Sequence, residues 1–74
     1  MEIKVLLKEQ LAKRGLTQKD LSEATGIRAA TINDLYHNKS KQLPVKAIEK
    51  IATELQIVDI SELIILKETD QQDA

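Results

Sequence analysis

The sequence predicts a compact all-α domain of five short helices. Through most of the chain, apolar residues recur at three- and four-residue spacing, which is the period of an amphipathic helix. The 74 residues include only two glycines and one proline, and this low content favours helices over turn-rich β folds. Tyrosine occurs once, and phenylalanine and tryptophan are absent, so aliphatic side chains must form the core. A chain of this length makes one domain and buries roughly 60% of its unfolded surface.

The first predicted helix runs from Ile3 to Arg14. Its apolar positions share one face, and lysines stand between them: Ile3, Leu6, Leu7 and Leu11. Gly15 follows and ends the helix.

A capping signal marks the start of the second predicted helix, Gln18 to Thr25. Thr17 offers a hydroxyl N-cap, and Asp20, three residues later, makes an acidic variant of the capping box that also suits the helix dipole. Gly26 stands where this helix must stop, because glycine adopts the left-handed C-cap conformation without strain. A tight turn therefore follows.

The third predicted helix spans roughly Arg28 to His37, with Ile32 and Leu35 on its inner face. Asn38 can close it, because asparagine tolerates the left-handed conformation better than other non-glycine residues. The polar residues 39–42 after it form a basic loop.

A fourth helix is predicted from Pro44 to about Leu55, since proline suits a first helical turn and apolar residues repeat behind it. A short fifth helix would begin at Asp59 or Ser61 and contain Leu63, Ile64 and Leu66, although the β-branched residues there also permit a strand. We expect residues 1–68 to form the domain and residues 69–74 to be a flexible polar tail.

Composition excludes several classes of function. Without cysteine and with a single histidine, the chain has no disulfide or thiolate metal site, and we expect no metal or other cofactor. Lysines interrupt the N-terminal apolar residues, and no apolar run nears the ~20 residues of a membrane span, so a cytoplasmic protein is predicted. No nucleophile with a base, paired acids or phosphate-binding glycine loop is present, which argues against an enzyme.

Charge is divided unevenly along the chain. Residues 1–50 hold ten lysines and arginines against six acids, a net charge of +4, whereas residues 51–74 hold Lys67 against six acids, a net charge of −5. The net charge of −1 therefore hides a basic body with an acidic end, and the body is the part suited to an anionic partner.

Two short helices joined by a glycine turn form the layout that places the second helix in a major groove. The segment LTQKDLSEATGIRAATINDLYHNK, residues 16–39, resembles the phage repressor and Cro-like (XRE-type) helix-turn-helix family. The most specific matching positions are Gln18, Leu21, Ser22, Gly26, Ile32 and Leu35.

The resemblance extends over about residues 3–66 and implies a five-helix, lambda-repressor-like domain. It implies a transcriptional regulator that binds specific sequences of double-stranded DNA, with residues 28–37 as the recognition helix. Gln56 departs from the family, which usually has a helix-ending glycine there, and the following loop is about one residue longer.

The resemblance also assigns candidate DNA contacts. Gln18, at the start of the second helix, would bind a phosphate. Arg28 would pair with guanine or with a phosphate, and Asn33 would either read an adenine edge or stay solvated. Ala29 and Ala30 replace longer polar readers and offer only apolar contact, for example to thymine methyl groups.

The remaining candidates differ in charge. Asp34 would be repelled by phosphate unless it accepts from cytosine or pairs with Arg28 or Lys41. His37, at the end of the recognition helix, would complement the helix dipole or a phosphate. Lys39 and Lys41 match the part of the family that contacts the DNA backbone, although each also fits a solvated basic loop.

We also expect a homodimer, because one recognition helix covers only a few base pairs. Its predicted surface is the apolar set of the C-terminal third: Ile57, Val58, Ile60, Ile64, Ile65 and Leu66. The rival hypothesis is a protein-interaction module of the antitoxin or anti-repressor type, which Asp34, the two alanines and a pI near 5.8 would allow.

Overall fold

The structure, a computed structural model, describes residues 1–68, so the predicted tail of residues 69–74 lies outside the described part. Its elements, in chain order, are β1 (Glu2–Val5), α1 (Leu7–Arg14), α2 (Gln18–Thr25), α3 (Ala29–Tyr36), α4 (Val45–Glu54), a 3-10 helix η1 (Ile60–Glu62) and β2 (Ile64–Lys67). Within residues 1–68, no helix is long and apolar enough to cross a bilayer.

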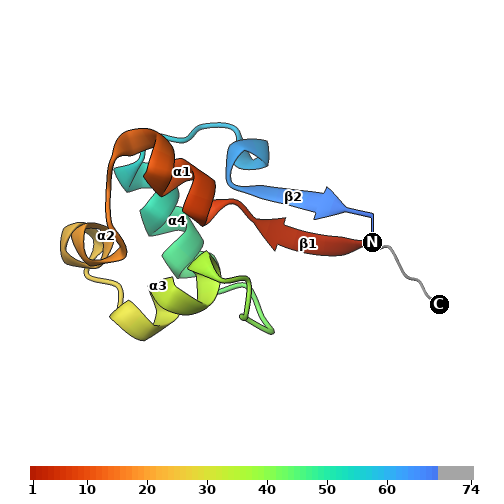
Figure 1. Cartoon of the computed structure of the whole chain (residues 1–74), viewed down its shortest axis with the longest axis horizontal. Coiled ribbons are helices and arrows are strands. Elements are labelled where there is room, and N and C mark those ends of the chain that lie inside the picture. The colour runs from red at the N-terminus through yellow and green to blue at the C-terminus, as the bar shows by residue number, and fades with distance from the viewer. Residues whose placement is uncertain (69–74) are drawn as a thin grey trace.

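The four α-helices pack around one aliphatic core, and the two strands form a ribbon that projects from them (Figure 1). The most deeply buried side chains come from every α-helix and from the residue after η1: Leu7, Leu11, Leu21, Ile32, Leu35, Ile51 and Leu63. Tyr36, the one aromatic residue, packs against this core and is half-buried.

The prediction of a first helix from residue 3 was wrong. Residues 2–5 form strand β1, and α1 begins only at Leu7. β1 pairs antiparallel with β2, in a register that sets Ile3 opposite Leu66 and Val5 opposite Ile64. These four residues share one face of the ribbon, and its inner end packs on the core through Val5, which is buried, and Ile64, which is half-buried.

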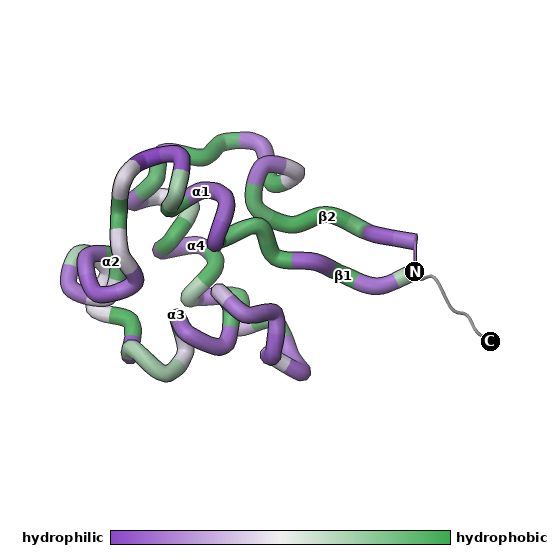
Figure 2. The backbone as a smooth tube through the Cα atoms, in the orientation of Figure 1, coloured by the Kyte–Doolittle hydropathy of each residue, from purple (hydrophilic) through white to green (hydrophobic). Residues whose placement is uncertain are grey.

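The predicted fifth helix was also wrong, and so was the all-α class. Asp59 does cap a short turn, since its carboxylate accepts from the Ser61 N–H at 3.0 Å, but η1 ends at Glu62. The chain then extends into β2, which is hydrophobic over most of its length (Figure 2). Adjacent β-branched residues, Ile64 and Ile65, fit this strand better than a helical turn.

The ends of the other helices agree with the sequence. Thr17 and Asp20 make both hydrogen bonds of the capping box at the start of α2. Gly26 adopts φ +75° at its end, and Asn38 adopts φ +57° after α3, so both predicted left-handed positions are confirmed. Pro44 lies one residue outside α4, as its N-cap.

Gln56 closes α4 in the conformation that a glycine would usually supply. Its φ is +57°, and two backbone hydrogen bonds surround it, from Gln56 N–H to Thr53 and from Ile57 N–H to Ala52. This pair of bonds defines the Schellman motif. The chain therefore ends α4 in a Schellman motif without a glycine.

A polar network behind α1 ties the C-terminal segment to the helices. Gln10 is buried and donates to the carbonyl of Glu62 at 2.7 Å, and its amide oxygen accepts from Arg14. Arg14 also donates to the carbonyl of Leu55 at 2.9 Å, at the end of α4. One side-chain pair thus satisfies two backbone carbonyls from separate segments.

Candidate nucleic-acid interface

The turn between α2 and α3 is fixed by local hydrogen bonds. Ser22 on α2 donates its hydroxyl to the carbonyl of Ile27 at 2.6 Å, and Thr25 accepts from the Ile27 N–H at 3.2 Å. Ile27 is buried in the hydrophobic core, so its side chain holds the turn against the rest of the domain. Arg28 follows in extended conformation, with φ −62° and ψ 140°, as the N-cap of α3. This geometry sets the angle at which α3 leaves α2.

One face of α3 packs on the core, and the opposite face is exposed to solvent. Ile32 and Leu35 are fully buried against the core. The predicted contact residues at this helix all lie exposed, and they are Arg28, Ala29, Ala30, Asn33, Asp34 and His37. The structure thus gathers these six residues at one helix, while their contacts with DNA stay predictions.

Gln18 and Asn33 are linked across the two helices. The side-chain amide of Asn33 donates to the amide oxygen of Gln18 at 3.2 Å. Gln18 is half-buried at the first turn of α2, and Asn33 is exposed in the middle of α3. The sequence placed both residues at the interface but did not predict that they contact each other.

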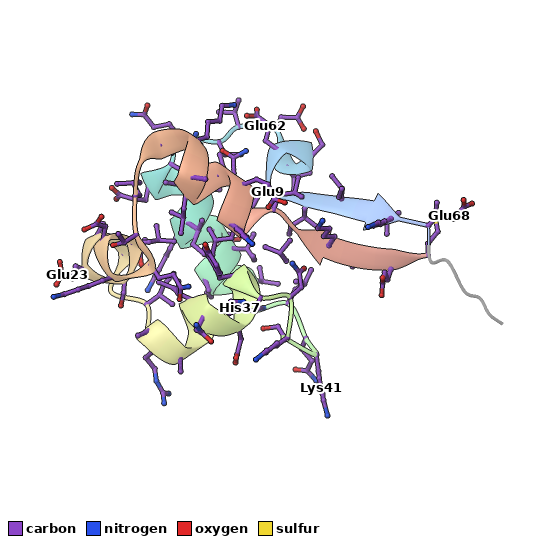
Figure 3. The ribbon with its side chains drawn as sticks, viewed as in Figure 1. Glu9, Glu23, His37, Lys41, Glu62 and Glu68 are labelled. Atoms are coloured by element: carbon purple, nitrogen blue, oxygen red, sulfur yellow. The ribbon has the colours of Figure 1, made fainter. Side chains whose placement is uncertain are left out.

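The loop after α3 carries the two candidate lysines, Lys39 and Lys41, and both are exposed. Asn38 fixes the start of this loop, because its side-chain amide makes two hydrogen bonds with the backbone of Val5, at 2.6 and 3.0 Å. Figure 3 shows Lys41 projecting from this loop away from the ribbon. The sequence predicted the left-handed backbone of Asn38 but not this contact.

Acidic side chains of the C-terminal segment lie elsewhere. Glu62 lies on η1 and Glu68 follows β2, and Figure 3 shows both well away from His37 and Lys41. The other acids expected there, Asp70 and Asp73, lie outside the described residues. The described charges therefore divide the molecule as the sequence predicted, with the lysine loop apart from these acids.

Asp34 has no ion pair within residues 1–68, where the pairs are Lys4 with Glu9 and Lys46 with Glu49, each at 4.0 Å. The pairing with Arg28 or Lys41 that the sequence allowed is thus not seen there. His37 packs edge-on against Tyr36, with ring centroids 5.0 Å apart. Residues 1–68 hold no cluster of three groups suited to a metal ion.

Comparison with models of known protein families gives a match. The sequence model of the Cro/C1-type HTH DNA-binding domain matches residues 6–69, which is most of the chain. No curated protein and no solved structure matches it.

Proposed function

Because the chain belongs to the Cro/C1-type helix-turn-helix family of DNA-binding domains, we propose that it is a transcriptional regulator that binds specific duplex sequences with α3 in the major groove. The observation that carries this proposal is the open face of α3. It is anchored by buried residues, exposes six side chains, and has the lysine loop directly after it. A cytoplasmic location would give the protein access to chromosomal DNA.

The proposed DNA contacts are of two kinds, those that position the protein on the phosphate backbone and those that read the bases. Lys39, Lys41 and Gln18 stand beside α3 and would hold the phosphate backbone, which fixes register without reading sequence. Arg28, at the N-terminal end of α3, has the reach to pair with a guanine edge. Ala29 and Ala30 on the first turn fit thymine methyl groups, so much of the specificity would rest on Arg28 and Asn33.

A homodimer would give this interface a two-fold site. Within the predicted apolar set, Ile57 is 8% exposed and belongs to the core, so its inclusion was wrong. Ile64 and Ile65 are half-buried, and the residues left exposed are Val58, Ile60 and Leu66. Leu66, 64% exposed, is paired with Ile3, 51% exposed, on the same face of the ribbon.

The exposed apolar pair on the ribbon supplies the dimer surface. The ribbons of two copies would stack face to face through Leu66 and Ile3, and a two-fold axis between them would relate the two α3 helices.

A salt titration tests the DNA contact. Affinity for mixed duplex DNA should fall steeply as salt rises, and Lys41→Ala should weaken binding and reduce the salt slope by about 1. Lys13→Ala, at the end of α1, is the matched control, because it removes the same charge away from α3. Binding that ignores both salt and Lys41 would leave the rival reading, an interaction module on this fold.

Sedimentation tests the dimer. Leu66→Glu should convert the free protein to a monomer, because a carboxylate cannot be buried unpaired between two ribbons. Val58→Glu is the control, since Val58 is 98% exposed but does not lie on the ribbon. A wild-type protein that stays monomeric and binds a half-site as tightly as a full site would remove the dimer from the proposal.

A further inference from the structure

The outer edge of β1 is partly closed by a side chain. Val5 donates its N–H to the amide oxygen of Asn38 at 2.6 Å, and its carbonyl accepts from the amide nitrogen of Asn38 at 3.0 Å. A residue on a neighbouring antiparallel strand would exchange the same two bonds. Asn38 therefore stands where a third strand of the sheet would begin.

The register shows that this edge continues beyond Asn38. Next to the ribbon, Leu6 donates to the carbonyl of Leu63 at 2.7 Å, so the following pair, Val5 with Ile64, is not hydrogen-bonded internally. The alternation makes Ile3 with Leu66 a second such pair. The N–H and C=O of Ile3 thus point outward beside those of Val5, and within residues 1–68 they have no partner.

Two hollows flank this open edge, one on each face of the ribbon. The larger, about 590 Å³, has an apolar floor and a lysine at its rim, and it is lined mainly by Met1, Ile3, Val5, Leu35, Lys41 and Leu43. The smaller, about 300 Å³, is mostly charged and is lined by Glu2, Ile3, Lys4, Asn38 and Lys67. Ile3 and Asn38 line both hollows, so the edge runs between them.

We propose that the outer edge of β1 is a docking site for an extended segment of a partner protein. The segment would add a third strand by bonding the backbone of Ile3. Side chains of a strand alternate between its two faces, so apolar ones would enter the larger hollow and acidic ones the smaller. Lys4 and Lys67 outnumber Glu2 among the residues that line the smaller hollow, and the ion pair of Lys4 with Glu9 is exposed and 4.0 Å long. The recognised chemistry is an alternation of apolar and acidic residues.

The position of this site links it to the lysine loop. Lys41 lines the larger hollow, and Asn38, the first residue after the C-cap of α3, lies at the edge itself. Apolar side chains of a docked segment that fill the larger hollow would press on Lys41 at its rim and displace the lysine loop that the proposed DNA complex uses, so docking would lower DNA affinity. This consequence rests on the proposed function, whereas the docking itself does not.

The probe is a labelled six-residue peptide with blocked ends that alternates glutamate and valine, titrated with the full chain in the absence of DNA. We expect it to bind more tightly than a block peptide of the same composition and than a lysine–valine alternation. Ile3→Pro removes the outward N–H and should weaken binding about tenfold, the loss expected for roughly 1.4 kcal/mol. Val58→Pro is the control, because Val58 is 98% exposed and lies outside the ribbon, so this proline leaves both strand edges unchanged.

Hydrogen exchange on the wild-type chain gives a readout that needs no variant. Saturating peptide should slow exchange of the Ile3 amide and leave that of Leu66 unchanged. Equal binding of the alternating and block peptides, or an Ile3 amide that stays unprotected, would overturn the docking site. Peptide binding that leaves DNA affinity intact would overturn only the link to Lys41, while salt-independent DNA binding without peptide would overturn the proposed function alone.

Discussion

The side-chain amide of Asn33 donates a hydrogen bond of 3.2 Å to the amide oxygen of Gln18. This bond joins the first turn of α2, where a phosphate would bind, to the middle of α3, where a base would be read. It orients both side chains before any DNA arrives. We therefore expect Gln18, the proposed phosphate contact, and Asn33, the proposed base reader, to act as one unit.

A double-mutant cycle measures this unit. Gln18→Ala and Asn33→Ala should each weaken DNA binding, and the double variant should lose less than the sum, with a coupling of about 0.5–1.5 kcal/mol, the worth of one hydrogen bond. Affinities of the four proteins for one duplex at fixed salt provide the measurement. Strictly additive losses would mean that the bond does not persist in the complex.

Arg28 should carry discrimination between sites. Arg28→Ala is expected to lower the preference for a selected site over random DNA by about 1–3 kcal/mol, the range for a bidentate base contact. Arg28→Lys is the matched variant, because it keeps the charge but loses the planar fork. If both variants discriminate as well as wild type, Arg28 contacts phosphate or solvent only.

Gly26 should resist any side chain. Its φ of +75° lies in the left-handed region, and a Cβ there would meet no other atom within 4 Å, so the cost of substitution is backbone strain alone. We expect Gly26→Ala to destabilise the domain by about 1 kcal/mol and Gly26→Val by more. Urea unfolding measures this, and an unchanged midpoint for the valine variant would contradict the turn geometry.

Gln56 offers the opposite change. Its φ of +57° strains a residue with a Cβ, so Gln56→Gly should relieve about 1 kcal/mol and lose part of that gain to the freer unfolded chain. A net stabilisation of a few tenths of a kcal/mol is expected in urea unfolding. Gln56→Ala is the control and should gain nothing, because alanine keeps the Cβ.

Asp20 should make stability depend on pH. Hydrogen bonds from the backbone and then the side chain of Thr17 lower the pKa of Asp20 below its ordinary value of 3.8. A lowered folded-state pKa adds stability above 3.8, and this stability is lost as pH falls through the folded value. Asp20→Asn should therefore be less stable than wild type at pH 7, with a gap that closes in acid. A gap of constant size across an unfolding series would exclude this linkage.

The sequence predicted those elements whose signals lie within a few residues of one another. The capping pair Thr17 and Asp20, the left-handed Gly26 and the buried Ile32 each follow from local rules, so α2, the turn and α3 were predicted to within a residue. The ribbon was not, because Ile3 and Leu7 also fit a helical period. Residues 2–5 form a strand because they pair with β2, where Ile3 lies opposite Leu66, far along the chain.

The same distinction holds at the candidate site. Exposure of the α3 face follows from helix periodicity around Ile32 and Leu35 and was predicted. The bonds of Asn33 to Gln18 and of Asn38 to Val5 depend on how separate elements pack, and no residue pattern encoded them. Ile57 was misassigned to an interface because the core extends into the loop after α4.

The pairing of Glu2 with Lys67 has a kinetic meaning. The helical contacts, such as those of α2 with α3, join segments that are close in sequence. The ribbon instead joins the two ends of the described chain, so forming it closes a loop of most of the residues. The entropy lost in closing that loop must be spent before the strands can pair. The helices should thus assemble first and the ribbon should zip last. Local unfolding of the native protein should begin where folding ends. The ribbon would open as a separate cooperative unit, and the amides of β1 and β2 would exchange with solvent through openings that leave α3 folded.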